Sequence, residues 1–237
     1  SGNGDGGKAT NARLGEPHSV AVGLDGSLFI VDTYNNNVRR VRPDGIIETV
    51  LGNTNGNAGS TGDGGPGTQA LLNEPLGITV GLDGSLYVTE HAGNRVRRLA
   101  PDGTTSTVAG DGTAGNSGDG GVATEAQLSG PHSVDVAPDG TLYITDEGND
   151  RVRMVTPDGI IRALSGGGTQ EPNEYVPAQD AAFQVPRLVN VEPSGRVLIT
   201  DIAADMVYRL VPFLPSNDPN GYTIAADNGL SYHVFDG

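Results

Sequence analysis

The chain has 237 residues, among them 37 Gly and 15 Pro, and it carries a formal net charge of −15 at pH 7. An acidic chain is repelled by nucleic acids and by anionic membrane surfaces, so neither is expected as a partner. The chain has no apolar run near the roughly 18 residues that span a bilayer, and the absence of Cys excludes disulfides and thiolate metal sites.

Four segments with one pattern follow one another along the chain. Each begins with a Pro and an alternating apolar stretch, and an acidic residue stands 15 positions after the Pro in every copy. Successive copies are 58, 56 and 55 residues apart. The prolines are Pro17, Pro75, Pro131 and Pro186, and the acids are Asp32, Glu90, Asp146 and Asp201. A constant interior with variable connectors predicts four structural repeats joined by surface loops.

Each copy contains four short strands separated by turn residues. In the first copy, residues 17–22 alternate between apolar and polar side chains, which predicts a strand with two unlike faces. An Asp-Gly turn leads to a second strand near 27–32, and an Asn-rich turn leads to a third near 38–41. A Pro-Asp-Gly turn leads to a fourth strand near 48–51. Four antiparallel strands joined by hairpins make a β-propeller blade.

We therefore expect an all-β chain with about four four-stranded blades, forming part of a larger propeller. The predicted inner strands carry Val20, Val22, Ile78, Val80, Val134, Val136, Val189 and Val191. The expected units lie near 17–52, 75–110, 131–166 and 186–226.

The connectors between copies carry a second signature, Gly-Asp-Gly-Gly, at 4–7, 62–65 and 118–121. A stretch that could form one or two helical turns follows each connector, and the fourth version, at 177–183, is degenerate. The connectors lack the alternating acids and terminal Glu of a calcium loop, and no Lys-Ser or Lys-Thr follows to make a phosphate loop. We interpret them as turns, with calcium binding as the alternative.

The combined pattern of Gly-Asp-Gly-Gly, Pro, apolar strand, Asp-Gly, Leu-Tyr-Ile-Thr-Asp and Arg-Val-Arg resembles NHL repeats. It is most similar to the long-loop version found in teneurins and in bacterial proteins with YD (Rhs) repeats, and the resemblance covers residues 4–211. It implies a propeller domain over 1–211, followed over 212–237 by a Pro-rich connector and the start of a C-terminal β segment. The tail around 221–237 resembles the segment that opens a YD shell after such a propeller.

The repeat acids and the arginines of the third strand have structural and functional interpretations. Because an acid recurs in every copy, we expect each carboxylate to accept backbone N–H bonds from its own turn. A ring of metal or substrate ligands is the alternative. We expect the arginines to pair with repeat acids between blades, whereas a basic binding stripe is the alternative. These arginines are Arg39, Arg40, Arg97, Arg98, Arg151, Arg153 and Arg209.

His18 and His132 share the position directly after the blade Pro, where Leu76 and Arg187 stand in the other copies. In a propeller, this inner strand lines the central channel. NHL-type lyases hold zinc with channel histidines from separate blades, and a catalytic zinc usually takes three protein ligands. The position supplies two histidines, so we expect no metal or other cofactor, with zinc as the alternative. His18, His132 and Arg187 are candidate binding residues at the channel mouth.

The resemblance implies a non-catalytic scaffold or interaction propeller in a large secreted or cell-surface protein, teneurin-like or of the toxin-associated Rhs type. Its expected partners are proteins: the rest of the same polypeptide, a YD-type shell or a surface receptor. The alternative is a metal-dependent lyase or lactonase-like hydrolase. We expect no direct membrane insertion. Because an arc of four blades leaves two sheet faces bare, we also expect further blades before this stretch and self-association through the open edges.

Overall fold

The computed structural model describes residues 4–172, 176–212 and 222–226, and these residues form four antiparallel sheets of four strands each. The first sheet contains β1 (Pro17–Val22), β2 (Leu28–Asp32), β3 (Asn37–Val41) and β4 (Ile47–Leu51). The second contains β5 (Pro75–Val80), β6 (Leu86–Glu90), β7 (Arg95–Leu99) and β8 (Thr105–Ala109). The third contains β9 (Pro131–Val136), β10 (Leu142–Asp146), β11 (Arg151–Val155) and β12 (Ile161–Gly166). The fourth contains β13 (Pro186–Val191), β14 (Val197–Asp201), β15 (Met206–Pro212) and β16 (Tyr222–Ala226).

The strands of each sheet lie in chain order, so successive strands are antiparallel neighbours. The prediction of an all-β chain with four four-stranded propeller blades is confirmed. The helices of the described part are 3-10 turns of three residues: η1 (Ala9–Asn11), η2 (Thr33–Asn35), η3 (Gly67–Gln69), η4 (Ala123–Glu125), η5 (Glu147–Asn149) and η6 (Ala178–Asp180). Within the described ranges, no helix has the length and apolar character required to cross a bilayer.

Asp-Gly turns set the hairpin between the first two strands of a blade. Between β5 and β6, the Asp83 carboxylate accepts hydrogen bonds from Ser85 N at 2.9 Å and from Ser85 Oγ at 2.8 Å. Gly84 takes a φ of +81°, a region that Gly reaches at low cost. The backbone bond from Ser85 is the main cause of the lowered pKa of Asp83. The turn therefore reverses the chain with its polar groups bonded.

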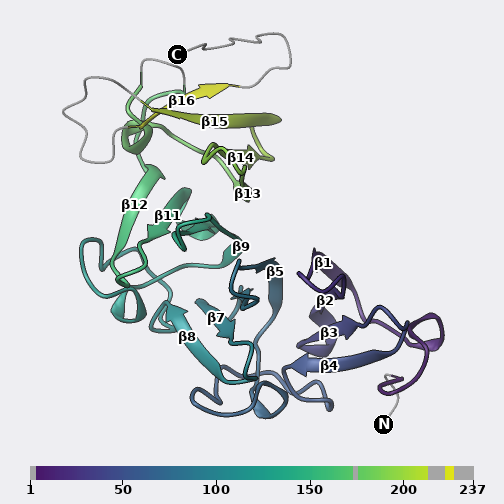
Figure 1. Ribbon diagram of the computed structural model, residues 1–237. Coiled ribbons are helices and arrows are strands. Elements are labelled where there is room, and N and C mark those ends of the chain that lie inside the picture. The colour runs from purple at the N-terminus through teal and green to yellow at the C-terminus, as the bar shows by residue number, and fades with distance from the viewer. Residues whose placement is uncertain (1–3, 173–175, 213–221, 227–237) are drawn as a thin grey trace.

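The blades follow one another in an arc, with the first strand of each blade on the inside (Figure 1). Strand β5 contacts β1, β9 contacts β5, and β13 contacts β9. The apolar residues expected on inner strands therefore lie on β1, β5, β9 and β13.

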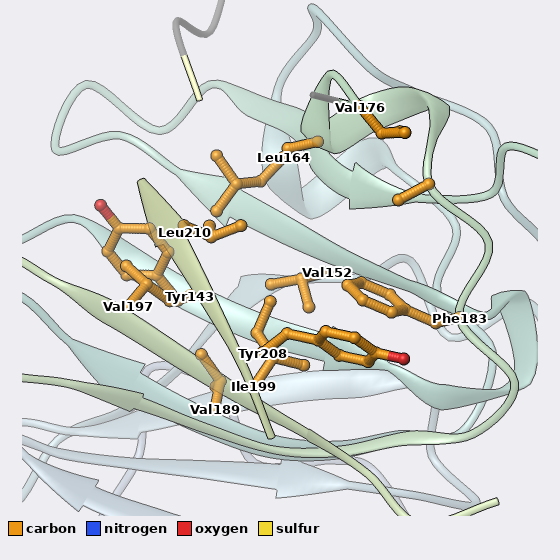
Figure 2. Packing of buried hydrophobic residues seen from close by; sticks show 12 residues of the cluster. Tyr143, Val152, Leu164, Val176, Phe183, Val189, Val197, Ile199, Tyr208 and Leu210 are labelled. Carbon is orange, nitrogen blue, oxygen red and sulfur yellow. The ribbon is translucent and has the colours of Figure 1, made fainter. Parts of the chain in front are cut away.

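The hydrophobic core is divided among three blade-to-blade interfaces. Each cluster combines residues from one blade with residues from the next, and full burial of a Val or Leu side chain contributes about 1.5–3 kcal/mol. Figure 2 shows the cluster between the third and fourth blades, where the rings of Phe183 and Tyr208 lie 5.4 Å apart. A residue of a third strand and one of the next blade's first strand recur in the same cluster: Val38 and Ile78, Val96 and Val134, and Val152 and Val189.

Strand β16 completes the fourth sheet by pairing with β15. Residues 222–226, which the sequence assigned both to the fourth unit and to a C-terminal segment, thus lie in the fourth blade. Residues 213–221 and 227–237, which include most of the expected Pro-rich connector and C-terminal β segment, lie outside the described residues.

Candidate functional site

Two histidines and one arginine from the inner strands meet beside a small cavity. His18 lies on β1, His132 on β9 and Arg187 on β13, each directly after the Pro that opens its blade. The rings of His18 and His132 are 5.0 Å apart between centroids and cross at 68°. Together with Leu76, the three residues line a cavity of about 250 Å³. The structure therefore brings together the three channel residues that the sequence singled out.

His132 is held neutral by its surroundings. Its side chain is 4% exposed. Burial, followed by the electrostatic effects of Arg187, His18 and His91, lowers its pKa to about 4. The Nδ1 atom of His132 has no hydrogen-bond partner among the described residues. His132 can therefore offer an uncharged ring nitrogen to a polar group in the cavity.

Acidification from pH 7 to 4.5 is expected to destabilise the wild-type chain more than a His132→Leu variant. The pKa of His132 is about 4 in the folded state, against 6.5 for an unperturbed His, so protons bind preferentially to the unfolded state. Its stabilising contribution is fully present above pH 6.5 and is lost as the pH falls toward 4. The wild type should lose about 2.5 kcal/mol more than the variant. Urea unfolding at both pH values measures this difference.

The wild type has to be compared with the variant because the pKa values of other buried groups are shifted as well. Burial raises the pKa of Glu90 and of Asp146, which strengthens folding toward acid and opposes the effect of His132. Leu is the matched replacement because Leu76 holds the same position in the second blade. If the variant lost as much stability on acidification as the wild type, His132 would not be the titrating group.

Neighbouring blades hold the channel residues in place through threonines of the second strand. Thr89 Oγ1 donates to the carbonyl of His132 at 3.0 Å, and Thr145 Oγ1 donates to the carbonyl of Arg187 at 3.0 Å. The Arg187 guanidinium also pairs with Glu147 Oε1 at 3.1 Å. Sequence reasoning missed all three partners. The Thr that precedes the acid in the second and third copies was a visible signal, whereas Glu147 had none.

The four repeat acids are buried at one shared position: Asp32, Glu90, Asp146 and Asp201. Asp32 accepts a hydrogen bond from Gly15 N at 2.6 Å, and Asp146 accepts one from Ser129 N at 2.7 Å. These donors lie at the entrance of the blade, 17 residues before the acid. This corrects the expectation of donors from the acid's own turn for these two acids; the turn of the third blade supplies a side chain, Asn149 to Asp146 at 2.8 Å. In the fourth blade the expectation holds, because Ala204 N of the turn donates to Asp201 Oδ1 at 3.3 Å. Each acid therefore binds backbone N–H groups at the start of its own blade.

Each of the first three blades buries one arginine completely between two carboxylates. In the second blade, Arg97 lies 3.3 Å from Glu90 Oε2 and 2.7 Å from Asp63 Oδ1. The other blades repeat this arrangement: Arg39 with Asp32 and Asp5, and Arg153 with Asp146 and Asp119. The expected pairing between blades is therefore corrected, because the arginine and the repeat acid belong to one blade. The Gly-Asp-Gly-Gly loop is also more than a turn, since its Asp binds this arginine.

The fourth blade lacks both the buried arginine and the loop aspartate that binds it. Tyr208 stands at the position of the buried arginine, and the degenerate connector carries no Gly-Asp-Gly-Gly. Tyr208 packs instead against Phe183 (Figure 2). The joint loss of the loop Asp and the strand Arg was a sequence signal that could have revealed the contact.

The two ends of the arc expose side chains that the interior blades bury. Val20 on β1 is 61% exposed, whereas Ile78, Val134 and Val189 at the same position are 7%, 3% and 5% exposed. Val207 on β15 is 38% exposed, whereas its counterparts Val38, Val96 and Val152 are all 0% exposed. We call the first surface, with Val20 and Val22, the leading face, and the second, with Val207, the trailing face.

Comparisons with known proteins agree with this architecture. The sequence profile described as "Teneurin NHL domain" matches residues 1–60 and 90–156. Teneurin-1 of Gallus gallus is 26% identical over 308 residues, covering 98% of this chain and 11% of that protein. Teneurin-m of Drosophila melanogaster is 32% identical over 173 residues, covering 68% of this chain and 6% of that protein. The chain thus spans about a tenth or less of the length of these relatives.

A solved structure shows a similar fold. Virginiamycin B lyase from Staphylococcus aureus superimposes with a TM-score of 0.57 at 17% identity, covering 89% of this chain and 55% of that one. At this level of identity the likeness concerns the fold alone. In the part of the chain that the structure describes, no three or more His, Cys, Asp or Glu residues gather as a metal site would require.

Proposed function

Because the chain belongs to the Teneurin NHL domain family, we propose that it is a non-catalytic interaction propeller of a larger cell-surface protein. The observation that carries this proposal is the exposure of apolar side chains at the two ends of the arc, Val20 and Val22 at one end and Val207 at the other. Its partners are further blade-like sheets, from the same polypeptide or from another copy, which cover the leading and trailing faces.

A leading face and a trailing face pack against each other at the interfaces between blades inside the arc. Val38 in the first blade holds the position of Val207, and Ile78 in the second blade holds the position of Val20. Both belong to one buried cluster between these two blades. A blade that meets the leading face would therefore present a trailing face of the same type. Such contacts run head to tail, so they extend the arc or close it into a ring.

The isolated chain is expected to self-associate in a concentration-dependent manner in sedimentation velocity. A Val20→Asp, Val22→Asp variant should lose this association because it places charges on the leading face. Val207→Asp should do the same at the trailing face. Leu82→Asp is the matched control, since Leu82 is 70% exposed on an interior blade and lies on neither end face. Association that survives both end-face variants, or that Leu82→Asp abolishes equally, would contradict the proposal.

A metal-dependent lyase or lactonase-like hydrolase is the second candidate, favoured by the adjacent rings of His18 and His132. The interaction proposal predicts no stoichiometric zinc or other transition metal in the pure chain. Elemental analysis tests this prediction directly. About one zinc per chain that disappears in His132→Leu would support the enzyme and count against the non-catalytic proposal.

A further inference from the structure

The trailing face carries a row of three side chains that runs across β13, β14 and β15. Leu188 pairs with Thr200, and Thr200 pairs with Val207. Val189, the next residue of β13, is buried against the third blade. Because successive side chains of a strand point to opposite faces, the row lies on the trailing side. We call these three residues the trailing row.

The second and third blades have the same row with a smaller residue at its inner end. The second blade has Gly77, Thr89 and Val96, and the third has Ser133, Thr145 and Val152. All six residues are buried. In the fourth blade the inner end is Leu188, which is 51% exposed. The trailing row thus keeps the Thr and the Val of an interior row but has a bulky residue in place of Gly or Ser.

The threonine of an interior row bonds to two blades at once. Thr145 Oγ1 accepts a hydrogen bond from Ser133 N of its own blade at 2.8 Å and donates to the carbonyl of Arg187 in the next blade at 3.0 Å. Thr89 Oγ1 donates in the same way to the carbonyl of His132 at 3.0 Å. The acceptor is in both cases the residue after the Pro that opens the next blade. This bond therefore sets how closely two inner strands approach.

The threonine of the trailing row has only the first of these two bonds. Thr200 Oγ1 accepts from Leu188 N at 3.0 Å, and its hydrogen has no acceptor among the described residues. In a second copy of the chain, the carbonyl of His18 follows the opening Pro and matches the missing acceptor. Its setting is that of an interior blade, because Glu16, two residues before His18, has a φ of +51°, and Glu74 in the second blade has +52°.

The interior interfaces leave no room for a leucine at the inner end of the row. A Cβ atom added to Gly77 would lie 2.7 Å from the carbonyl oxygen of His132 and 2.9 Å from Cα of Ser133, both backbone atoms of the next blade. At the following interface, Ser133 Oγ already lies 3.4 Å from the backbone N of Val189. A leucine has three carbons beyond Cβ where a serine has one oxygen. A close-packed interface accepts them only if the two inner strands move apart.

We propose that Leu188 restricts the docking of a second copy on the trailing face, an inference that rests on the proposed function. Leu188 holds β1 of the second copy away from β13, so that the Thr200 hydroxyl does not reach the carbonyl of His18. The second copy then packs on the outer part of the trailing face, around Val207. Leu188 thereby makes the contact between two copies weaker than the contact between two blades of one chain.

Sedimentation equilibrium of the full chain tests this role. Leu188→Ser, which copies Ser133, should lower the dissociation constant of self-association by about tenfold or more, because it removes the overpacking at the inner strands. If Leu188 only contributed apolar contact, the same substitution would weaken the association. Leu82→Ser is the matched control, since Leu82 is 70% exposed on an interior blade, and it should leave the constant unchanged. Adding Val20→Asp to Leu188→Ser should abolish the association.

Thr200→Val separates the hydrogen bond from the overpacking. Val31 holds this position in the first blade, so a blade accepts Val there. In the Leu188→Ser chain, Thr200→Val should weaken the association about threefold to tenfold, the net value of one hydrogen bond. In the wild-type chain it should change nothing, because Leu188 prevents that bond.

The outcomes distinguish this inference from the proposed function. Wild-type association that Leu188→Ser leaves unchanged or weakens would overturn the role of Leu188 and leave the proposed function standing. A gain that survives Val20→Asp would also overturn it. Association of Leu188→Ser alone would support the role of Leu188 and contradict the expected association of the wild type. If neither chain associated, both would be wrong.

Discussion

Replacing Arg97 by Met is expected to lower the free energy of unfolding by about 3–5 kcal/mol, the cost of leaving a buried charge without its partner. The arginine is fully buried, and Glu90, also fully buried, lies 3.3 Å from it. Asp63 Oδ1 and the carbonyls of Thr61 and Leu71 accept its remaining hydrogen bonds. Removing Arg97 therefore leaves Glu90 uncompensated and releases the loop that carries Asp63. Urea unfolding at pH 7 measures the loss.

The neighbouring residue provides the control. Arg98 pairs with Asp83 at 2.9 Å, but its side chain is one-third exposed, so Arg98→Ala should cost about 1 kcal/mol or less. Adding Glu90→Gln to Arg97→Met should recover part of the loss, because the amide carries no buried charge. Equal losses for Arg97→Met and Arg98→Ala would show that the buried pair does not hold the blade together.

Replacing Asp146 by Ala is expected to cost a similar amount, about 3–5 kcal/mol. The carboxylate accepts hydrogen bonds from Ser129 N at 2.7 Å, from Asn149 Nδ2 at 2.8 Å and from Arg153 Nη1 at 3.4 Å. Its loss leaves Ser129 N, at the start of the third blade, without its hydrogen-bond acceptor. It also leaves the buried Arg153 guanidinium with one carboxylate instead of two. Thermal and urea unfolding should both show the destabilisation.

Asp139→Ala is the matched control in the same blade. Asp139 bonds only to Thr141 N among the described contacts, at 2.9 Å, and lies in an exposed turn. Its removal should cost about 0.5–1.5 kcal/mol, the usual net value of one hydrogen bond. If Asp146→Ala kept the wild-type melting temperature while binding of a ligand was lost, the carboxylate would be functional rather than structural.

The blades could be predicted because their signals are local and repeated. Alternating apolar residues, Asp-Gly turns and the constant interval from Pro17 to Asp32 all act within about one hairpin of sequence. The meeting of His18 and His132 followed from the same register, since equivalent positions of inner strands face one channel.

Contacts between distant segments were not predictable in the same way. The loop residue Asp63 binds Arg97 across 34 positions of sequence, and strand periodicity does not reveal which loop folds over which strand. The cavity beside His18 and His132 likewise depends on side-chain volumes and on the spacing of neighbouring blades. Neither quantity has a sequence pattern of its own.

Disulfide trapping tests the central claim, that the ends of the arc are docking faces, most directly. The chain contains no Cys, so introduced thiols can react only with one another. A Val20→Cys chain is mixed with a Val207→Cys chain under mild oxidation, with Leu82→Cys in place of either as the control. Our account predicts a disulfide-linked Val20→Cys/Val207→Cys dimer in clear excess over every pairing with the control. A yield no higher than that of the control pairings would contradict it.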